Sequence, residues 1–219
     1  MAGRYHTETF DKIPAEKRER ILRAAAKILG RDGVGGARMG DIAAEAGISH
    51  GSLFTYFPTK DDLVRAVVER GVAMERERFP AGEDAPFAAA VEGVMTRAWE
   101  TASAEGGLIS LWLSFSLAEN GRFSDDILPL EEDAARRWSD LVDRAAADGD
   151  IRGDADPRAV KFLLDAAVAQ LMKSRASDLE RSKFALLFGN AEEAPLLIAR
   201  TLARLLEGRR NEGNDPKAS

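Results

Sequence analysis

The chain has 219 residues, 45% of them hydrophobic, and contains no cysteine. It is therefore large enough to bury a substantial core, while disulfides, thiol nucleophiles and thiolate metal sites are excluded. The N-terminus lacks the apolar core of a signal peptide, and no run approaches the roughly 20 apolar residues of a membrane span. We therefore expect a soluble, cytoplasmic protein with no membrane contact.

The net charge of -6 is unevenly distributed along the chain. Residues 1–60 carry 10 Lys and Arg against 7 Asp and Glu, a net charge of +3, whereas the remainder carries 21 against 30, a net charge of -9. Of the two parts, the basic one is therefore N-terminal, and any contact with nucleic acid is expected at that end of the molecule.

The first part of the chain predicts four helices. Residues 1–13 are polar and unpatterned and are expected to form a flexible tail. A first helix over about 15–31 follows Pro14, and the breaker cluster 32–36 precedes a short second helix over about 39–46. Gly47 ends that helix. Ser49 is a good N-cap for a third helix over about 50–57, and Thr59 caps a fourth with Asp62 at the capping-box position.

Apolar spacing predicts helices throughout the rest of the chain, with turn signals near 80–86, 106–107, 120–121, 148–157 and 189–190. The fold class is all-α, with an N-terminal helix-turn-helix domain and a C-terminal helical ligand-binding and dimerisation domain. The expected organisation is a tail at 1–13, the helix-turn-helix at 14–60, the larger domain at 61–208 and a flexible tail at 209–219.

The stretch from Asp41 to Phe57 predicts a DNA-binding helix-turn-helix. Two short helices joined by a tight turn cannot bury enough area alone, so their apolar residues must pack on the first helix. The third helix then presents small and hydrogen-bonding side chains that suit a major groove. These outward residues are Ser49, His50, Ser52, Thr55 and Tyr56, with Gly51 allowing close approach of the backbone. Lys60, just beyond, favours phosphate oxygens.

This stretch resembles the TetR family of transcriptional regulators. The resemblance is carried by Ile42-Ala43, Ala46 to Ser49, Gly51 to Phe54, Tyr56-Phe57 and Lys60. It implies that His50, Gly51 and Ser52 face bases and that Tyr56 and Lys60 hold phosphates. Arg38 stands where the family usually has Thr, and it could reach a phosphate or the groove. Capping and solvation are the alternative roles for the polar residues, and packing at a helix end is the alternative for Tyr56.

An enzyme is not expected. Gly47 to Gly51 spells the nucleophile-elbow pattern of hydrolases, but an elbow needs a preceding strand, and here a helix precedes it. His6 is a bystander in the expected tail, and no ligand cluster predicts a metal site or a cofactor.

The larger domain contains an apolar and aromatic set that could line a ligand pocket. Its members are Met95, Trp99, Trp112, Phe115, Ser116, Glu119, Phe123, Trp138, Phe162 and Asp165. Plain core packing is the alternative, because aromatic stripes usually only pack. In a pocket, Glu119 or Asp165 would favour a ligand with a cationic or hydrogen-bond-donating group on an apolar body.

Residues 157–172 and 196–206 are apolar on several faces, and a helix without a polar face needs two partners. These helices predict a homodimer that joins through an intersubunit four-helix bundle and reads a palindromic operator in double-stranded DNA. The expected function is a repressor released by a small-molecule effector. A DNA-binding regulator without an effector, and an activator, remain open as alternatives.

Overall fold

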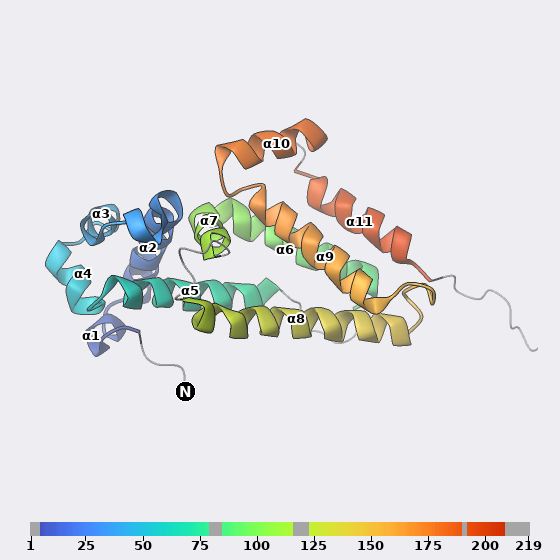
Figure 1. Ribbon diagram of the computed structural model, residues 1–219, viewed down its shortest axis with the longest axis horizontal. Helices are drawn as coiled ribbons and strands as arrows, with labels where there is room; N and C mark the ends of the chain where they lie inside the picture. Colours follow the sequence, from blue (N-terminus) through green and yellow to red (C-terminus); the bar gives the residue numbers. More distant parts are fainter. Residues whose placement is uncertain (1–4, 79–84, 116–122, 190–191, 209–219) are drawn as a thin grey trace, which may run out of the picture.

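The computed structural model describes residues 5–78, 85–115, 123–189 and 192–208 and is built from helices (Figure 1). The helices are α1 (Glu8–Asp11), α2 (Ala15–Gly36), α3 (Met39–Glu45), α4 (His50–Tyr56), α5 (Lys60–Arg78), α6 (Phe87–Ala104), α7 (Gly106–Phe115), α8 (Ser124–Ala147), α9 (Pro157–Lys173), α10 (Asp178–Phe188) and α11 (Ala194–Leu206). Within the described ranges no strand forms, apart from an isolated bridge between Ile151 and Glu207. The all-α prediction is confirmed.

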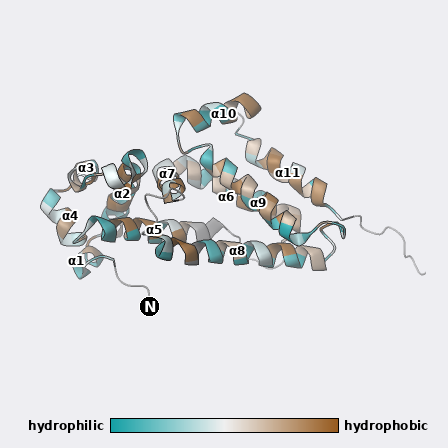
Figure 2. Cartoon of the chain, in the orientation of Figure 1, coloured by the Kyte–Doolittle hydropathy of each residue, from teal (hydrophilic) through white to brown (hydrophobic). Residues whose placement is uncertain are grey.

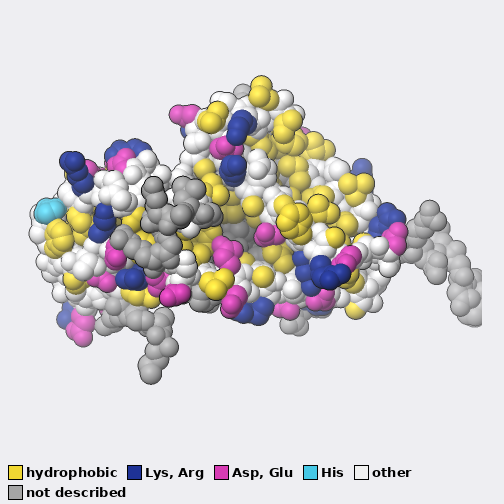
Figure 3. All heavy atoms as spheres, viewed as in Figure 1, with side chains coloured by type: hydrophobic (Ala, Val, Ile, Leu, Met, Phe, Trp, Pro, Cys, Tyr) yellow, Lys and Arg dark blue, Asp and Glu magenta, His cyan; other side chains and the backbone are white. Residues whose placement is uncertain are grey.

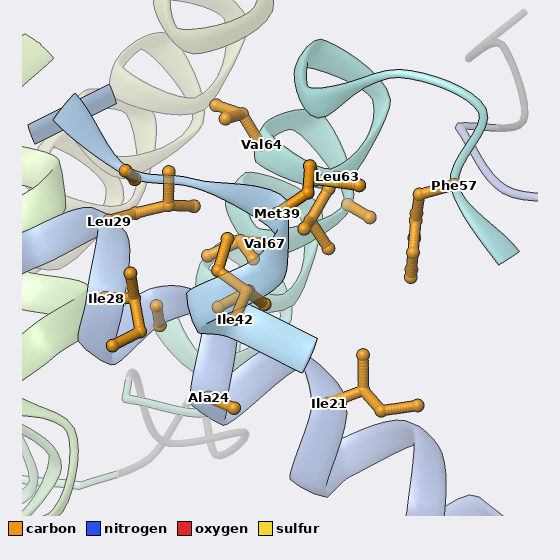
Figure 4. Close-up of a cluster of buried hydrophobic side chains, with 14 of the residues drawn as sticks. Ile21, Ala24, Ile28, Leu29, Met39, Ile42, Phe57, Leu63, Val64 and Val67 are labelled. Atoms are coloured by element: carbon orange, nitrogen blue, oxygen red, sulfur yellow. The ribbon is translucent and has the colours of Figure 1, made fainter. Parts of the chain in front are cut away.

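The N-terminal helices enclose a continuous apolar core. Figure 4 shows side chains of α2, α3 and α5 converging, among them Ile21, Ile42 and Val67. Ile21, Ile42 and Val67 are completely buried. Because the same cluster includes residues of α5 and α7, the core of the helix-turn-helix continues past the predicted boundary at residue 60.

The first helix ends close to the predicted position. Gly33 has φ 72° and ψ 163°, which interrupts α2 before its last three residues. This conformation lies in the left-handed range of φ that glycine adopts without steric cost. The expected ends of the second and third helices differ from the observed ones by a single residue each.

The N-terminal segment differs from its prediction. Residues 8–13 were expected within a flexible tail, but Glu8–Asp11 form helix α1, and Phe10 is buried. Phe10 packs against the rings of Tyr56 and Phe57, with centroids 5.7 and 4.7 Å apart. These contacts were missed because they join residues far apart in the sequence. The C-terminal tail predicted at 209–219 lies outside the described residues.

A second core lies among α6, α8, α9 and α11. In Figure 1 these helices occupy the half of the molecule opposite α3 and α4, and α10 lies across the ends of α9 and α11. Figure 2 shows hydrophobic residues along the visible faces of α9 and α11. None of the helices among the described residues is both long enough and apolar enough to cross a membrane.

The two halves meet where α2 crosses α7. A Cβ added to Gly30 would stand 2.1 Å from the carbonyl oxygen of Gly107, and one added to Gly107 would stand 2.6 Å from the Cα of Lys27. Side chains at either glycine would therefore force the helices apart. The pair allows the backbone of the first helix to touch the backbone of α7 directly.

Candidate nucleic-acid interface

The turn between α3 and α4 is fixed by local backbone geometry. Gly47 has φ 65°, and its N–H donates to the carbonyl of Ala44 over 3.1 Å. The N–H of Ile48 then donates to the carbonyl of Ala43 over 3.0 Å. This is a glycine-terminated helix end, which satisfies carbonyls that the helix cannot pair internally. The chain therefore leaves α3 in a defined direction and enters α4 after four residues, 46–49.

Ser49 caps the start of α4, as the sequence predicts. Its Oγ accepts a hydrogen bond from the N–H of Ser52 over 3.1 Å and lies 2.8 Å from the Ser52 Oγ. Serine is among the strongest N-cap residues because its oxygen satisfies an otherwise unpaired amide. The hydroxyls of Ser49 and Ser52 take part in this cap, so for these two residues a contact with a base would compete with capping.

The outward side of α4 is accessible. Ser49, His50, Gly51 and Thr55 are exposed, and Ser52 is half-buried. A Cβ on Gly51 would meet no atom within 4 Å, so its backbone faces open space. Arg38, at the N-cap position of α3, is exposed as well. The structure thus brings these predicted residues to the surface of the helix-turn-helix.

Two exposed side chains of α4 pack against each other. The His50 and Phe54 rings make an edge-to-face contact with centroids 4.9 Å apart. Such aromatic pairs restrict each other's rotamers. The imidazole of His50 is therefore held at the surface in a preferred orientation.

Tyr56 does not lie on the outward face, contrary to the sequence prediction. Only 6% of its surface is exposed, and its ring packs against Phe10 while the Lys17 ammonium lies 5.8 Å from the ring centroid. Tyr56 instead packs at the end of α4, which was the alternative role considered for this residue. The prediction failed because helical spacing does not reveal that α1 covers this position.

Lys60 is half-buried and already has partners within the chain. Its Nζ donates to the carbonyls of Gly35 and Ala37 over 3.4 and 3.2 Å. An ammonium at these carbonyls stabilises the end of the first helix. Lys60 therefore has a structural role beside the phosphate contact that the resemblance implies.

The helix-turn-helix is tied to the first helix by polar contacts. Arg20 Nε donates to the carbonyl of Ala46 over 3.1 Å, and Lys27 Nζ lies 2.7 Å from Glu45. Between them, these two bonds join α2 to the C-terminal end of α3. Together with the buried apolar residues they hold α3 and α4 as one rigid unit.

A buried ionic cluster joins the helix-turn-helix to the rest of the chain. Arg70 of α5 contacts Glu19 of α2 over 2.8 Å and Glu105, which follows α6, over 2.8 Å. The side chains of Arg70 and Glu105 are only 8% and 3% exposed. Arg23 of α2 completes the cluster, 3.0 Å from Glu105. Buried charges require such pairing, so the cluster fixes three helices relative to one another.

The cluster also shifts the protonation of its members. Burial alone would lower the pKa of Arg70, but hydrogen bonds with Glu19 and Glu105 outweigh it and raise that pKa above its ordinary value. The hydrogen bond from Arg70 lowers the pKa of Glu19. No local pattern predicted this cluster, because Arg70 lies 35 positions from Glu105 and 51 positions from Glu19.

The larger half contains a cavity of about 210 Å³ between α5, α6, α7, α8 and α9. Its lining includes Trp112 and Asp165, two of the residues predicted for a pocket. The Trp112 Nε1 donates to Glu131 over 3.0 Å. Sequence reasoning missed Glu131, Asp133 and Lys173, which also line the cavity.

The α9 wall of the cavity follows a helical spacing that was available in the sequence. Asp165, Val168, Ala169 and Met172 recur at intervals of three and four residues and share one face. The prediction did not single out this face because α9 is apolar on other sides as well.

Most other residues predicted for the pocket do not line this cavity. Met95, Phe123 and Trp138 are buried in the two cores, and Phe115 packs on Phe123. Trp99 packs beneath the Arg175 guanidinium, 3.9 Å from its ring centroid. Core packing, the alternative considered for the aromatic set, thus accounts for the buried members.

Phe162 is 72% exposed on the outside of α9, so its placement in a pocket is wrong. It was selected on its aromatic character, which does not indicate the side of the helix. Ser116 and Glu119 lie outside the described residues. Among the residues that are described, no group of three His, Asp or Glu side chains could hold a metal ion.

These features define a helix-turn-helix protein of the DNA-binding class: a short, capped helix with an accessible polar side, braced by two others. A family model described as bacterial regulatory proteins, tetR family, matches residues 21–67. The N-terminal part of the chain, which includes α3 and α4, is therefore similar to this family of bacterial regulatory proteins.

A relative and two solved structures are similar to a larger part of the chain. The chain is 27% identical over 158 residues to the HTH-type transcriptional repressor KstR2 of Rhodococcus jostii (strain RHA1), covering 69% of this chain and 76% of that protein. A TetR family transcriptional regulator from Chloroflexus aurantiacus has the same fold, with a TM-score of 0.64 and 20% identity over 93% of this chain and 99% of that chain. The transcriptional regulator FadR from Bacillus subtilis, in complex with stearoyl-CoA, matches with a TM-score of 0.63 and 14% identity over 86% and 97% of the two chains.

Proposed function

We propose that this regulator is a homodimeric repressor that binds a palindromic operator and is released by a small, partly apolar ligand. The observation that carries the proposal is the accessible polar side of α4, held rigidly by α2 and α3. A rigid helix of this length fits the major groove, where side chains can read base edges.

The exposure of each residue on this surface determines whether we assign it a contact with bases or with phosphates. His50, Gly51, Ser52 and Thr55 approach base edges from α4. Arg38 and Ser49 lie at helix starts, which face phosphates in such complexes. Lys60 contributes a phosphate contact only if its ammonium leaves the carbonyls of Gly35 and Ala37.

Selection of bound sequences from random duplexes tests DNA recognition directly. We expect palindromes to emerge. Changing Ser52 or His50 should then alter preference at particular base pairs, whereas Arg38→Ala should weaken binding to all selected sequences and reduce its salt dependence. The absence of any selected sequence at low salt would refute the proposal.

The apolar outer faces of α9 and α11 support a homodimer. Phe162, Leu163, Leu197 and Leu205 are all exposed on these two helices. Figure 3 shows hydrophobic side chains gathered over α9, α10 and α11. Exposed apolar patches of this kind mark protein interfaces. A second copy related by a two-fold axis would cover them and set the spacing of two recognition helices. Sedimentation at micromolar concentration should give the mass of a dimer.

The cavity supports binding of a small ligand. Leu108, Ile109 and Trp112 supply apolar and aromatic lining, while Glu131, Asp133 and Asp165 supply carboxylates. A ligand with a cationic or hydrogen-bond-donating group on an apolar body would use both kinds of lining.

Helix α7 offers a path from the cavity to the DNA-binding unit. Its residues Leu108, Ile109 and Trp112 line the cavity, and its Gly107 touches the backbone of α2. Movement of α7 on ligand binding would therefore displace the first helix. Coupling of about 1–3 kcal/mol, typical of allosteric proteins, would suffice to lower operator affinity 5- to 150-fold.

Thermal stabilisation by a compound panel tests the ligand proposal. The panel should include cationic amphiphiles and acyl-CoA esters, because a FadR was solved with stearoyl-CoA. We expect stabilisation by cationic amphiphiles, lost in Trp112→Ala. Stabilisation by acyl-CoA alone would overturn the ligand chemistry, and stabilisation by no compound would favour the regulator without an effector.

A further inference from the structure

Residues 5–11, which we call the N-terminal strap, contact the recognition helix at its C-terminal end. The Thr7 hydroxyl donates to the carbonyl of Thr55 over 2.8 Å, and the Thr7 N–H donates to the carbonyl of Tyr56 over 3.0 Å. The last carbonyls of a helix have no partner within it. Thr7 therefore supplies from outside a cap that the seven residues of α4 cannot make for themselves.

Apolar contacts hold the strap against the same helix end. Phe10 is 3% exposed and packs on Tyr56 and Phe57, and the His6 ring lies 6.5 Å from the Phe57 ring. The Arg18 guanidinium donates to the carbonyl of Asp11 over 3.1 Å, which ties the other end of the strap to α2. Both ends of the strap are thus anchored while Thr7 caps α4.

The start of the strap reaches the larger half of the molecule. The Tyr5 hydroxyl donates to Asp126, in the first turn of α8, over 3.3 Å. The Arg65 guanidinium pairs with the same carboxylate over 3.0 Å and lies 5.7 Å from the centre of the Tyr5 ring. Burial, with a contribution from Asp126, raises the pKa of Tyr5, so its hydroxyl stays protonated and able to donate.

We infer that the N-terminal strap positions the recognition helix for sequence-specific binding and links that helix to the first turn of α8. The inference rests on the proposed function in taking α4 as the helix that reads DNA. Thr7 and Tyr5 are positioning residues: they act through α4 and Asp126 and touch no base. A displacement of α8 is thereby transmitted to α4 through the strap and not only through α2.

Thr7→Val removes the hydroxyl and leaves the backbone hydrogen bond and the side-chain shape nearly unchanged. Thr9→Val makes the same chemical change two residues away, where the side chain is exposed, and is the matched control. Tyr5→Phe removes only the bond to Asp126 and changes no charge. Each full-length variant is compared with the wild type by two measurements.

The first measurement is the ratio of affinities for the selected operator and for a scrambled duplex of equal length. A variant that only unfolds more readily loses both affinities equally, so the ratio stays constant. We expect Thr7→Val to lower the ratio about 3- to 10-fold, as one hydrogen bond predicts, and Tyr5→Phe about twofold. Thr9→Val should leave it unchanged. An unchanged ratio for Thr7→Val overturns the inference, and an unchanged ratio for Tyr5→Phe alone overturns the link to α8.

The second measurement is hydrogen exchange of residues 50–57 in the free protein. We expect exchange in the last turn of α4 to be about threefold faster or more in Thr7→Val than in Thr9→Val. Equal rates refute the capping role of the strap. If the wild type selects no operator, the proposed function fails, and this measurement still decides whether the strap holds α4.

Discussion

The two ends of this molecule differ in how far their large apolar side chains are buried. At the helix-turn-helix, Ile42, Leu53 and Phe57 are completely buried, and the surface is mostly polar, with Phe54 as the large exception. At the other end, α9, α10 and α11 leave bulky side chains in solvent. These are Phe162, Leu163, Leu179, Leu186, Leu187, Leu197 and Leu205.

The difference indicates which end is complete within one chain. The helix-turn-helix buries most of its apolar side chains within the chain and has a mostly polar surface, which suits the proposed contact with DNA. Burial would stabilise each exposed leucine of the far end by about 1.5–3 kcal/mol, which favours the proposed homodimer at that surface. Four predictions test this contrast, beginning with the largest expected effect.

Two phenylalanines make the sharpest test. Phe57→Ala should lower the free energy of unfolding by about 3–5 kcal/mol, because it opens a cavity in a sealed core. Phe162→Ala removes the same atoms from a side chain that is 72% exposed and should change the unfolding of a single chain by less than about 0.5 kcal/mol. Urea unfolding at low protein concentration measures both. Equal losses would show that the two ends do not differ.

The second prediction concerns the far end alone. Leu197→Glu places a charge on the exposed face of α11, and the lost apolar burial should weaken dimerisation about 10- to 100-fold. Sedimentation over a range of concentrations measures the change. Leu128→Glu, an exposed leucine on α8, is the matched control and should sediment like the wild type. A dimer that withstands Leu197→Glu would place the interface elsewhere.

The features of the helix-turn-helix that could be predicted from the sequence depend on residues close together in the chain. Helix boundaries between residues 14 and 65 are set by neighbouring residues, such as Gly47 with its positive φ and the Ser49 cap, and the Thr59–Asp62 capping box forms as expected. These signals are local, so they can be read directly. The exposed side of α4 follows from them, because burial of Leu53 on one side turns the polar residues outward.

Features that depend on distant partners could not be read in this way. Phe10 is buried only because Tyr56 and Phe57 lie beside it, and Glu105 is buried only because Arg70 and Arg23 neutralise it. The cavity has the same property, since its walls come from five helices. Aromatic character identified Trp112 but misplaced Phe162, because hydrophobicity does not say which side of a helix faces a neighbour.

The third prediction is a pH dependence at the junction between the two ends. The pKa of Glu19 is lowered by its hydrogen bond with Arg70, so ionised Glu19 stabilises the fold. This contribution is present above the unfolded-state pKa, near 4.5, and is lost as the pH falls through the lower folded-state pKa. Because Glu19 is partly exposed, we expect Glu19→Gln to cost only about 1 kcal/mol at neutral pH and nothing in strong acid.

Stability of Glu19→Gln and the wild type, measured by urea unfolding from pH 7 down to pH 3, checks this sign. Glu16→Gln neutralises an exposed carboxylate in the first turn of the same helix and controls for net charge. A difference between Glu19→Gln and the wild type that does not decrease as the pH falls would mean that Glu19 acts through packing and not through its charge.

The smallest expected effect separates two roles of Lys60. As a cap of the Gly35 and Ala37 carbonyls, Lys60 stabilises the chain, so Lys60→Ala should cost about 0.3–1 kcal/mol of unfolding free energy. As a phosphate contact, its loss should also reduce the slope of log K against log salt by about 0.9 for each copy bound to DNA. A variant that loses stability but keeps the slope would leave Lys60 purely structural. The interface would then depend on Arg38 for its cationic contact, and the slope of Arg38→Ala would show the full reduction instead.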